Sequence, residues 1–455
     1  MSHTRLEESK RFLVPAIFLA VFVAYATLRI ANFSTMQEPR QWADTVSYVK
    51  KASMPLFRRG SHIGPLLGIL AWGLNGRSPT VPFLYKLVGS DPWAIAGLQL
   101  GLSISCWGLL ALFVARAVQV PQLKPIAFLC ILLFALSDSI ILWDGLLLSE
   151  SISLSLMALF IGSWLWLLEG WNRQKMALML ATAFLWGFTR DTNAWVLLLI
   201  ASTSAVAGSL WRSQRHYLLV AAILALFFVG NEIANHWAQR WRVPFVNVIG
   251  QRVLLDPESR AYFAQLGMPL TPAVLLLSGQ FAWDHDRAFF YAPALQDFRD
   301  WVSTRGKSSY LRFLLTHPHL TLGAPLQNAA ALLTPSFKDY PAAGFSPILR
   351  GTLAAVFYFK ETTFLWVWTF GLVGAVAFAV AARKVGPTWL VPLALILFTY
   401  PHAIIVWHGD TAEIGRHALQ VGVHSRLGLW IALVFVADLF LAERRQKIIH
   451  APAKI

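Results

Sequence analysis

Charged residues and cysteine are both scarce in this 455-residue chain. Only 13% of the residues are charged, 56% are hydrophobic, and 38 lysines and arginines stand against 23 aspartates and glutamates. Soluble domains carry about 25% charged residues, so this composition excludes one. Cys106 and Cys130 fall within expected membrane spans and say nothing about the redox compartment. The sequence also lacks an internal repeat and the inverted pair of broken apolar segments that marks many transporters.

Apolar runs long enough to cross a bilayer recur along most of the chain, and each crossing needs about 20 residues. We therefore expect an all-α polytopic membrane protein with about ten transmembrane helices. The first apolar run is too long for a signal-peptide core and is expected to remain as an anchor. The fifth is short, so it is either tilted or forms a hairpin with the sixth. The expected spans are 12–31, 92–116, 124–142, 146–168, 176–189, 193–211, 217–236, 362–382, 387–407 and 421–442.

Lysines and arginines in the short loops set the expected orientation, because they accumulate on the cytoplasmic side. With a cytoplasmic N-terminus, fifteen of them lie in inner segments, whereas the short outer turns and adjoining span ends hold three. Both termini are thus expected inside. The inner residues are Arg5, Lys10, Arg11, Arg116, Lys124, Arg173, Lys175, Arg212, Arg215, Arg383, Lys384, Arg444, Arg445, Lys447 and Lys454; the outer ones are Arg190, Arg416 and Arg426.

Two expected outer segments, 32–91 and 237–361, are too long to be turns. The first contains HIGPLLGILAWGLNG at 62–76, which favours an interfacial or re-entrant helix. The second is rich in aromatic residues and proline and is expected to form a small cap, with partly apolar helices near 310–317 and 319–333. Three regions are expected: a transmembrane module at 1–236, the cap, and a transmembrane module at 362–455.

Basic residues in the outer segments suit an anionic ligand at the outer leaflet. Nucleic acid is not expected as a partner, since the sequence contains neither a recognition motif nor a soluble basic domain. Membrane lipids are expected contacts throughout.

Asp44 and Tyr48, in ADTVSYVKKA, share one helix face directly after the first span. Two interpretations stand. Asp44 caps the helix that follows, as aspartate often does, or it is a general base exposed just above the membrane.

Glu150 lies in LLLSES at the outer entry of the fourth span, with Asp138 and Asp144 close before it. The dipole of a helix stabilises a carboxylate near its N-terminus, which gives Glu150 a structural account. Three acids at one span junction nevertheless exceed what capping requires. Arg190 and Asp191 lie in the next outer turn. They either pair with each other, or Arg190 faces a phosphate, whose oxygens its fork can bind in pairs.

The segment WHGDTAEIGRH places Asp410, Glu413 and His417 on one face of a short helix, with His408 before it and Arg416 beside it. Asp410 and Glu413 resemble a capping box, which gives a structural account. A metal site is conceivable, but the spacing matches no standard zinc motif. The polar motifs around Asp44, Glu150, Arg190 and Arg416 are all expected on the same side of the membrane. Ionisable groups at membrane spans are costly and usually mark a working site, so this shared location indicates function.

With these motifs in view, the chain resembles the GT-C superfamily of integral-membrane glycosyltransferases, and most of all bacterial members related to protein mannosyltransferases. The matching features are Asp-x-x-x-Tyr after the first span, an apolar outer helix, Leu-Ser-Glu-Ser at the fourth span, and a late His-Gly-Asp-x-x-Glu-x-x-Arg-His turn. The resemblance covers about residues 10–235 and the last two spans, but not the cap.

The resemblance implies a GT-C-like fold in a bacterial cytoplasmic membrane and transfer of a sugar from a polyprenyl phosphate to an acceptor hydroxyl on the extracytoplasmic face. The acceptor would be a glycan, a lipid or a protein of the cell envelope. Asp44 would be the base, with Glu150 as a second catalytic acid. The implied substrate-binding residues are Tyr48, Arg58, Arg59, Asp144, Arg190, Asp191, His408, Asp410, Glu413, Arg416 and His417.

Several relatives pair the loop acid with a second, adjacent acid, whereas Asp44 is followed here by Thr45. We therefore expect transfer without a metal and without a cofactor. Two other classes stay open as alternatives. A transporter or lipid-linked glycan flippase would place ionisable groups at mid-membrane depth. A polysaccharide polymerase or ligase would not need the early Asp44.

Overall fold

A bundle of long apolar helices forms most of the molecule. The computed structural model describes residues 3–56, 72–73, 76–210, 215–334, 346–358, 361–382 and 386–449. A backbone in hydrocarbon must satisfy its hydrogen bonds internally, and helices do so. Within the described residues, seven helices are long and apolar enough to span a membrane, or eight if one bent pair is counted. The chain is an all-α, multi-pass membrane protein, as the sequence predicts.

Most of the expected spans correspond to these helices within a few residues. The spanning segments belong to α1 (His3–Ser34), α5 (Pro92–Ala117), α8 (Ser149–Leu168), α10 (Asp191–Leu210), α11 (His216–Trp237), α22 (Leu390–Leu397) with η6 (Pro387–Trp389) and α23 (Thr399–Gly409), and α25 (Leu419–Ile449). The fifth expected span is α9 (Arg173–Gly187), and the eighth lies in α21 (Glu361–Ala382). The apolar stretches of these two helices are too short to count as spans, since α9 has 15 residues and the apolar part of α21 is Leu365–Phe378.

The third expected span differs from the prediction of one continuous helix. It is bent by 59° between α6 (Leu123–Ala135) and the pair α7 (Asp138–Ile141) and η1 (Leu142–Gly145). Arg29 on α1 gives a physical reason for the break. Its guanidinium donates to the carbonyl of Ala135 at 3.1 Å and pairs with Asp144 beyond the bend.

The segment that follows α1 is hydrogen-bonded to the segment that precedes α8, at one end of the bundle. Arg40 and Leu146 form an isolated bridge, and the hydroxyl of Thr45 donates to the carbonyl of Leu147 at 2.8 Å. This places α2 (Thr45–Ser53) beside the start of α8, and α4 (Thr80–Val88) packs on α2. The expected interfacial helix at 62–76 falls largely outside the described residues.

The first part of the segment between α11 and α21 folds around a core of its own, which includes Phe245, Phe263, Phe298, Trp301 and Phe313. The last helix of the segment instead packs on the main core, through Leu353 and Phe357. The first expected helix here is found and ends before His317, whereas the second is divided at Asn328 into two helices. The elements of this cap are α12 (Arg242–Val248), η3 (Ile249–Val253), α13 (Pro257–Gln265), α14 (Pro272–Leu275), α15 (Asp284–Tyr291), η4 (Pro293–Leu295), α16 (Gln296–Trp301), η5 (Val302–Gly306), α17 (Lys307–Thr316), α18 (Pro318–Gln327), α19 (Ala329–Leu333) and α20 (Pro347–Phe357).

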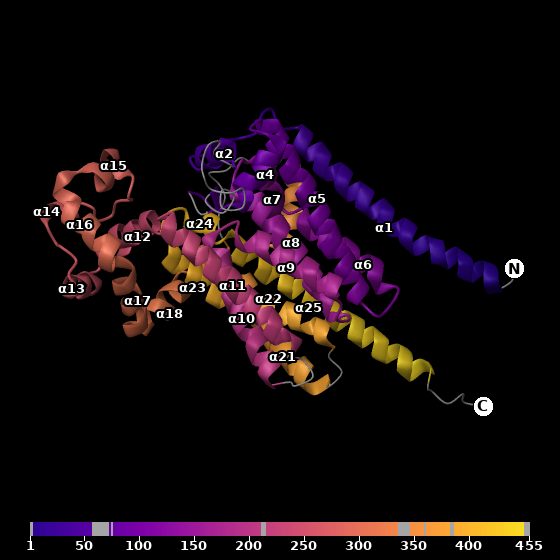
Figure 1. Cartoon of the computed structure of the whole chain (residues 1–455). Helices are drawn as coiled ribbons and strands as arrows, with labels where there is room; N and C mark the ends of the chain where they lie inside the picture. Colours follow the sequence, from indigo (N-terminus) through magenta and orange to yellow (C-terminus); the bar gives the residue numbers. More distant parts are fainter. Residues whose placement is uncertain are drawn as a thin grey trace.

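The two ends of the chain lie at the same end of the bundle, away from the cap (Figure 1). The helices α2, α4 and α24 (Ile414–His417) lie at the other end, next to the cap (Figure 1). The C-terminal helix α25 belongs to the same main core as the N-terminal helices, through residues such as Leu427 and Ile431. Residues 44, 150 and 416 are thereby brought to one end of the bundle.

Candidate functional site

Asp44 precedes α2 in the N-cap position, but its side chain makes no capping hydrogen bond. The carboxylate is instead bound by two arginines from distant segments. Arg77 pairs with Oδ1, and Nη2 of Arg416 lies 2.8 Å from Oδ2. The capping interpretation of Asp44 therefore does not account for this side chain.

Glu150 lies in the first turn of α8 and is completely buried, with 0% of its surface exposed. Its Oε1 is 3.2 Å from Nη1 of Arg190 and 3.3 Å from Nη1 of Arg416. A buried carboxylate is stable only when it is paired. Both of its cations come from turns that the sequence singled out, between α9 and α10 and before α25.

Arg416 is the centre of this network, because it also lies 2.7 Å from Oε2 of Glu413. Glu413 has a left-handed backbone, with φ 46° and ψ 45°, and its Oε1 accepts a hydrogen bond of 3.1 Å from Nε1 of Trp42. A non-glycine residue in this conformation stores strain, and such residues cluster at functional sites. The short turn that carries Arg416 is thus held towards the segment before α2.

The charges around Asp44 favour its ionised form. Burial opposes the charge of Asp44, but Arg77 and Arg416 outweigh burial and hold the pKa of the carboxyl below its ordinary value. Burial likewise opposes the charge of Arg416, yet Glu150, Asp44 and Glu413 raise the pKa of its guanidinium. We call Asp44, Arg77, Glu150, Arg190, Glu413, Arg416 and His417 the ion-pair network.

His417 joins the network as a neutral imidazole. Arg190 has only donors, so its Nη2, 2.7 Å from Nδ1 of His417, makes Nδ1 the acceptor and leaves the proton on Nε2. Burial, with the charges of Arg190 and Arg416, holds the pKa of His417 well below its ordinary value. Its Nε2 lies 4.0 Å from Oδ2 of Asp410.

Asp410 shapes the turn in which it lies. Its Oδ1 accepts from the backbone N–H groups of Thr411 and Ala412, at 2.7 and 3.0 Å, and from Nδ2 of Asn247 at 3.0 Å. Burial raises the pKa of this carboxyl above its ordinary value. Asn247 is on α12, so the turn is also attached to the cap.

Asp191 lies beside the network rather than in it. Arg240, just after α11, forms a bidentate pair with it, with Nη2 to Oδ1 at 2.8 Å and Nε to Oδ2 at 3.0 Å. A pairing of Asp191 with its neighbour Arg190, one of the two interpretations left open by the sequence, is absent from the described contacts. Sequence reasoning missed both Arg77 and Arg240, because each is one of several arginines in a long segment between spans and no motif sets it apart.

Three other expected residues have different surroundings. The ring of Tyr48 lies under the guanidinium of Arg77, 5.2 Å from its centroid. Asp144 is buried against Arg29, away from the network. His408 lies between Tyr310 Oη, 3.1 Å from Nδ1, and the carbonyl of Thr321, 3.0 Å from Nε2.

The two remaining expected residues, Arg58 and Arg59, lie outside the described residues.

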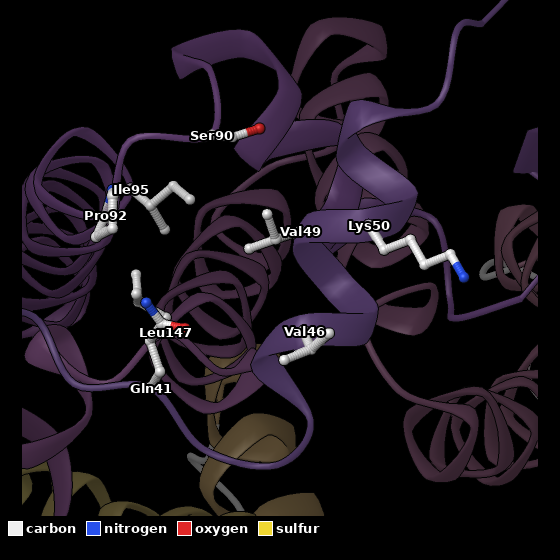
Figure 2. Close-up of a pocket in the computed structure, with 8 residues that line it drawn as sticks. All are labelled: Gln41, Val46, Val49, Lys50, Ser90, Pro92, Ile95 and Leu147. Atoms are coloured by element: carbon white, nitrogen blue, oxygen red, sulfur yellow. The ribbon is translucent and has the colours of Figure 1, made fainter.

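An open pocket of about 410 Å³ lies along another face of α2, away from the Asp44 carboxylate. Figure 2 shows its residues, with Val46 and Val49 from α2 facing Ile95 and Leu147, while the side chain of Lys50 points away from them. The pocket is mostly apolar and carries polar groups at its rim, namely Gln41, Lys50 and Ser90.

Within the part of the chain that the structure describes, no group of three or more His, Cys, Asp and Glu side chains is arranged to hold a metal ion. The metal interpretation of the 408–417 segment therefore has no geometric support in those residues. Independence from metals stays a prediction for chelation to test.

No family model and no curated protein matches the chain. The structure is similar to the crystal structure of the oligosaccharyltransferase of Archaeoglobus fulgidus in the apo form, with 13% sequence identity and a TM-score of 0.44. The similarity covers 98% of this chain and 53% of that chain, so this chain spans about half the length of that protein.

Proposed function

We propose that the chain is a GT-C-type glycosyltransferase, which transfers a sugar from a polyprenyl-phosphate donor to an acceptor hydroxyl on the extracytoplasmic side. One observation carries the proposal. Asp44, Glu150, Arg190 and Arg416, from four distant segments, form one connected network at a single end of a membrane bundle. Burying several charged side chains in a membrane protein costs free energy, and such clusters usually mark a working site.

The proposed step uses Asp44 as the base. The acceptor oxygen attacks the anomeric carbon of the sugar and passes its proton to the carboxylate of Asp44. The bond between the anomeric carbon and the phosphate oxygen breaks, and the electron pair leaves with the polyprenyl phosphate. A positioned base of this kind contributes about 10²–10⁴ in rate.

The arginines supply what the leaving group needs. The donor is a phosphodiester with one negative charge, and the departing lipid phosphate gains a second. Guanidinium groups bind phosphate oxygens in pairs and stabilise the charge that grows in the transition state. Arg190 and Arg416 are proposed for this role, with Glu150 and Glu413 fixing their direction.

The ends of the chain support the proposed sidedness, since both lie opposite the network (Figure 1). A test introduces single cysteines at exposed positions, Ser303→Cys in the cap and Gln174→Cys at the start of α9. We expect a membrane-impermeant maleimide to label Ser303→Cys on intact cells and Gln174→Cys only after lysis. The reverse pattern would invert the topology and with it the proposed face.

Asp44→Asn tests the base role, with Asp138→Asn as the matched control, because Asp138 pairs with Arg350 outside the network. We expect Asp44→Asn to lose about 10²–10⁴ in the rate of sugar transfer from a radiolabelled polyprenyl-phosphate sugar. The control should keep its rate, and chelators should not change the wild-type rate. Normal transfer by folded Asp44→Asn protein would refute the base role, and loss of activity on chelation would refute metal independence.

A further inference from the structure

Arg77, which the sequence did not single out, is held by one face of α2. Its Nη2 pairs with Asp44, its Nε donates to the hydroxyl of Ser47 at 2.8 Å, and its guanidinium lies over the ring of Tyr48. These residues stand at positions i, i+3 and i+4, which is the spacing of one helix face. The side chain of Arg77 therefore depends on α2 for all three of these contacts.

The backbone around Arg77 is fixed independently of its side chain. Nζ of Lys51, one turn further along the same face, donates to the carbonyl of Arg77. Arg240 donates to the carbonyl of Gly76 at 3.3 Å, and the hydroxyl of Ser78 donates to Asp191 at 3.1 Å. The guanidinium of Arg77 is thus able to change partner without movement of the segment that carries it.

The two arginines on Asp44 differ in access. The side chain of Arg77 is 39% exposed, whereas that of Arg416 is 5% exposed and also binds Glu150 and Glu413. Extracting Arg416 would leave a completely buried Glu150 short of a cation, which is costly. An anion that arrives from outside therefore meets Arg77 as the arginine that can be released.

We propose that Arg77 is a substrate-binding switch, which leaves Asp44 for the donor phosphate and so frees a carboxylate oxygen for the acceptor proton. This rests on the proposed function and deepens it. Before the donor binds, both oxygens of Asp44 are occupied by guanidinium groups. Once Arg77 has moved to the phosphate, Arg416 stays in place, where it orients the carboxylate and adds its charge to that of Arg190 beside the phosphate. Asp44 then becomes a stronger base only when substrate is present.

The test follows the protonation of Asp44 directly. Carbodiimides react with protonated carboxyl groups, so at pH 6 the rate of modification of Asp44, measured by peptide mass spectrometry, is proportional to its protonated fraction. The charged groups that face Asp44 in the described residues are Arg77 and Arg416. Loss of one opposing charge at this distance raises a carboxyl pKa by about 1–3 units, which is about tenfold or more in rate.

Farnesyl phosphate, a short prenyl phosphate, serves as the probe on the full-length protein in detergent. We expect it to accelerate modification of Asp44 by about tenfold or more. Farnesol, without the phosphate, should have no effect. Inorganic phosphate separates a lipid headgroup from a free anion: equal acceleration by both probes would assign the switch to phosphate alone.

Arg77→Gln should raise the rate of modification without any probe and should abolish the response to farnesyl phosphate. Arg77→Lys keeps a cation but cannot bind Asp44 and Ser47 as a fork, so an intermediate response is expected. Lys50→Gln is the matched control, because it removes another cation from α2, one that is not part of the ion-pair network. It should respond like the wild type.

A wild-type rate that neither farnesyl phosphate nor inorganic phosphate changes would overturn the switch, and so would a full response in Arg77→Gln. These results are separable from the function itself, which the transfer assay with Asp44→Asn tests. Sugar transfer that is lost in Asp44→Asn, together with a full response in Arg77→Gln, would keep the glycosyltransferase and remove the switch.

Discussion

Two groups of ion pairs in this molecule look alike in the sequence. They differ in whether their charged groups are fully paired and buried within the protein. Asp144 pairs with Arg29 inside the bundle, where their side chains are 5% and 1% exposed. Arg29 also donates to Tyr25 Oη at 2.7 Å and Ser103 Oγ at 2.6 Å, and Ser151 donates to the free oxygen of Asp144 at 2.8 Å. This pair, with its hydrogen bonds, is complete within the protein.

The ion-pair network is open by comparison. Asp44 is 24% exposed and Arg77 39% exposed, and Arg416 is shared among three carboxylates. Nε of Arg416 is buried without a hydrogen-bond partner in the described residues. A network with shared partners and an accessible edge can exchange a partner for a ligand, whereas the Arg29–Asp144 pair presents no exposed side chain to one.

The Arg29–Asp144 pair should therefore matter for stability and not for chemistry. We expect Arg29→Met to lower the free energy of unfolding by about 3–5 kcal/mol, because it leaves the buried Asp144 without its cation. Denaturant titration in detergent measures this loss. Sugar transfer per folded molecule should stay near that of the wild type.

The double variant Arg29→Met with Asp144→Leu controls this prediction. Replacing both members of a buried pair with apolar residues is often neutral, so most of the stability should return. A double variant that folds well but no longer transfers sugar would instead give Asp144 the substrate-binding role that the sequence predicts.

The open network should show the opposite pattern in Glu150→Gln. The amide keeps the shape of the side chain but removes the charge that directs Arg190 and Arg416. Misplacement of a phosphate-binding group by about 1 Å can cost about 10²-fold, so we expect a loss of that size in kcat. Steady-state kinetics with the lipid-linked donor measure it.

Glu169→Gln is the matched control, since Glu169 directly follows the other end of the same helix and pairs with Arg116 at 3.4 Å. It should have little effect, as exposed ion pairs contribute at most about 1 kcal/mol. Equal losses in the two variants would mean that Glu150 acts only through the stability of α8.

The spans could be predicted because hydrocarbon imposes length and apolarity on each helix separately. That Glu150, Arg190 and Arg416 come together could be predicted as well, since ionisable residues at span ends stand out individually. Their roles stay predictions. Asp144 met the same criterion, and its distinguishing partner, Arg29, is 115 residues away in sequence. Arg77 was missed because it follows Gly76 in a segment without periodicity, and only the folded chain shows that it faces Asp44.

The smallest expected effect concerns Lys51, which holds the backbone of Arg77. Burial, with Arg240 nearby, lowers the pKa of its ammonium from 10.5 to about 7. Between these values the unfolded chain binds more protons than the folded protein, so this group makes the free energy of unfolding rise with pH over that window. Lys51→Met should flatten this rise, measured by denaturant titration at pH 7, 8 and 9.

Lys86→Met is the control, because Lys86 also donates to backbone carbonyls, those of Ala52 and Met54, but away from Arg77. A rise that persists in Lys51→Met would place the titration on another group and leave the anchor of Arg77 independent of pH.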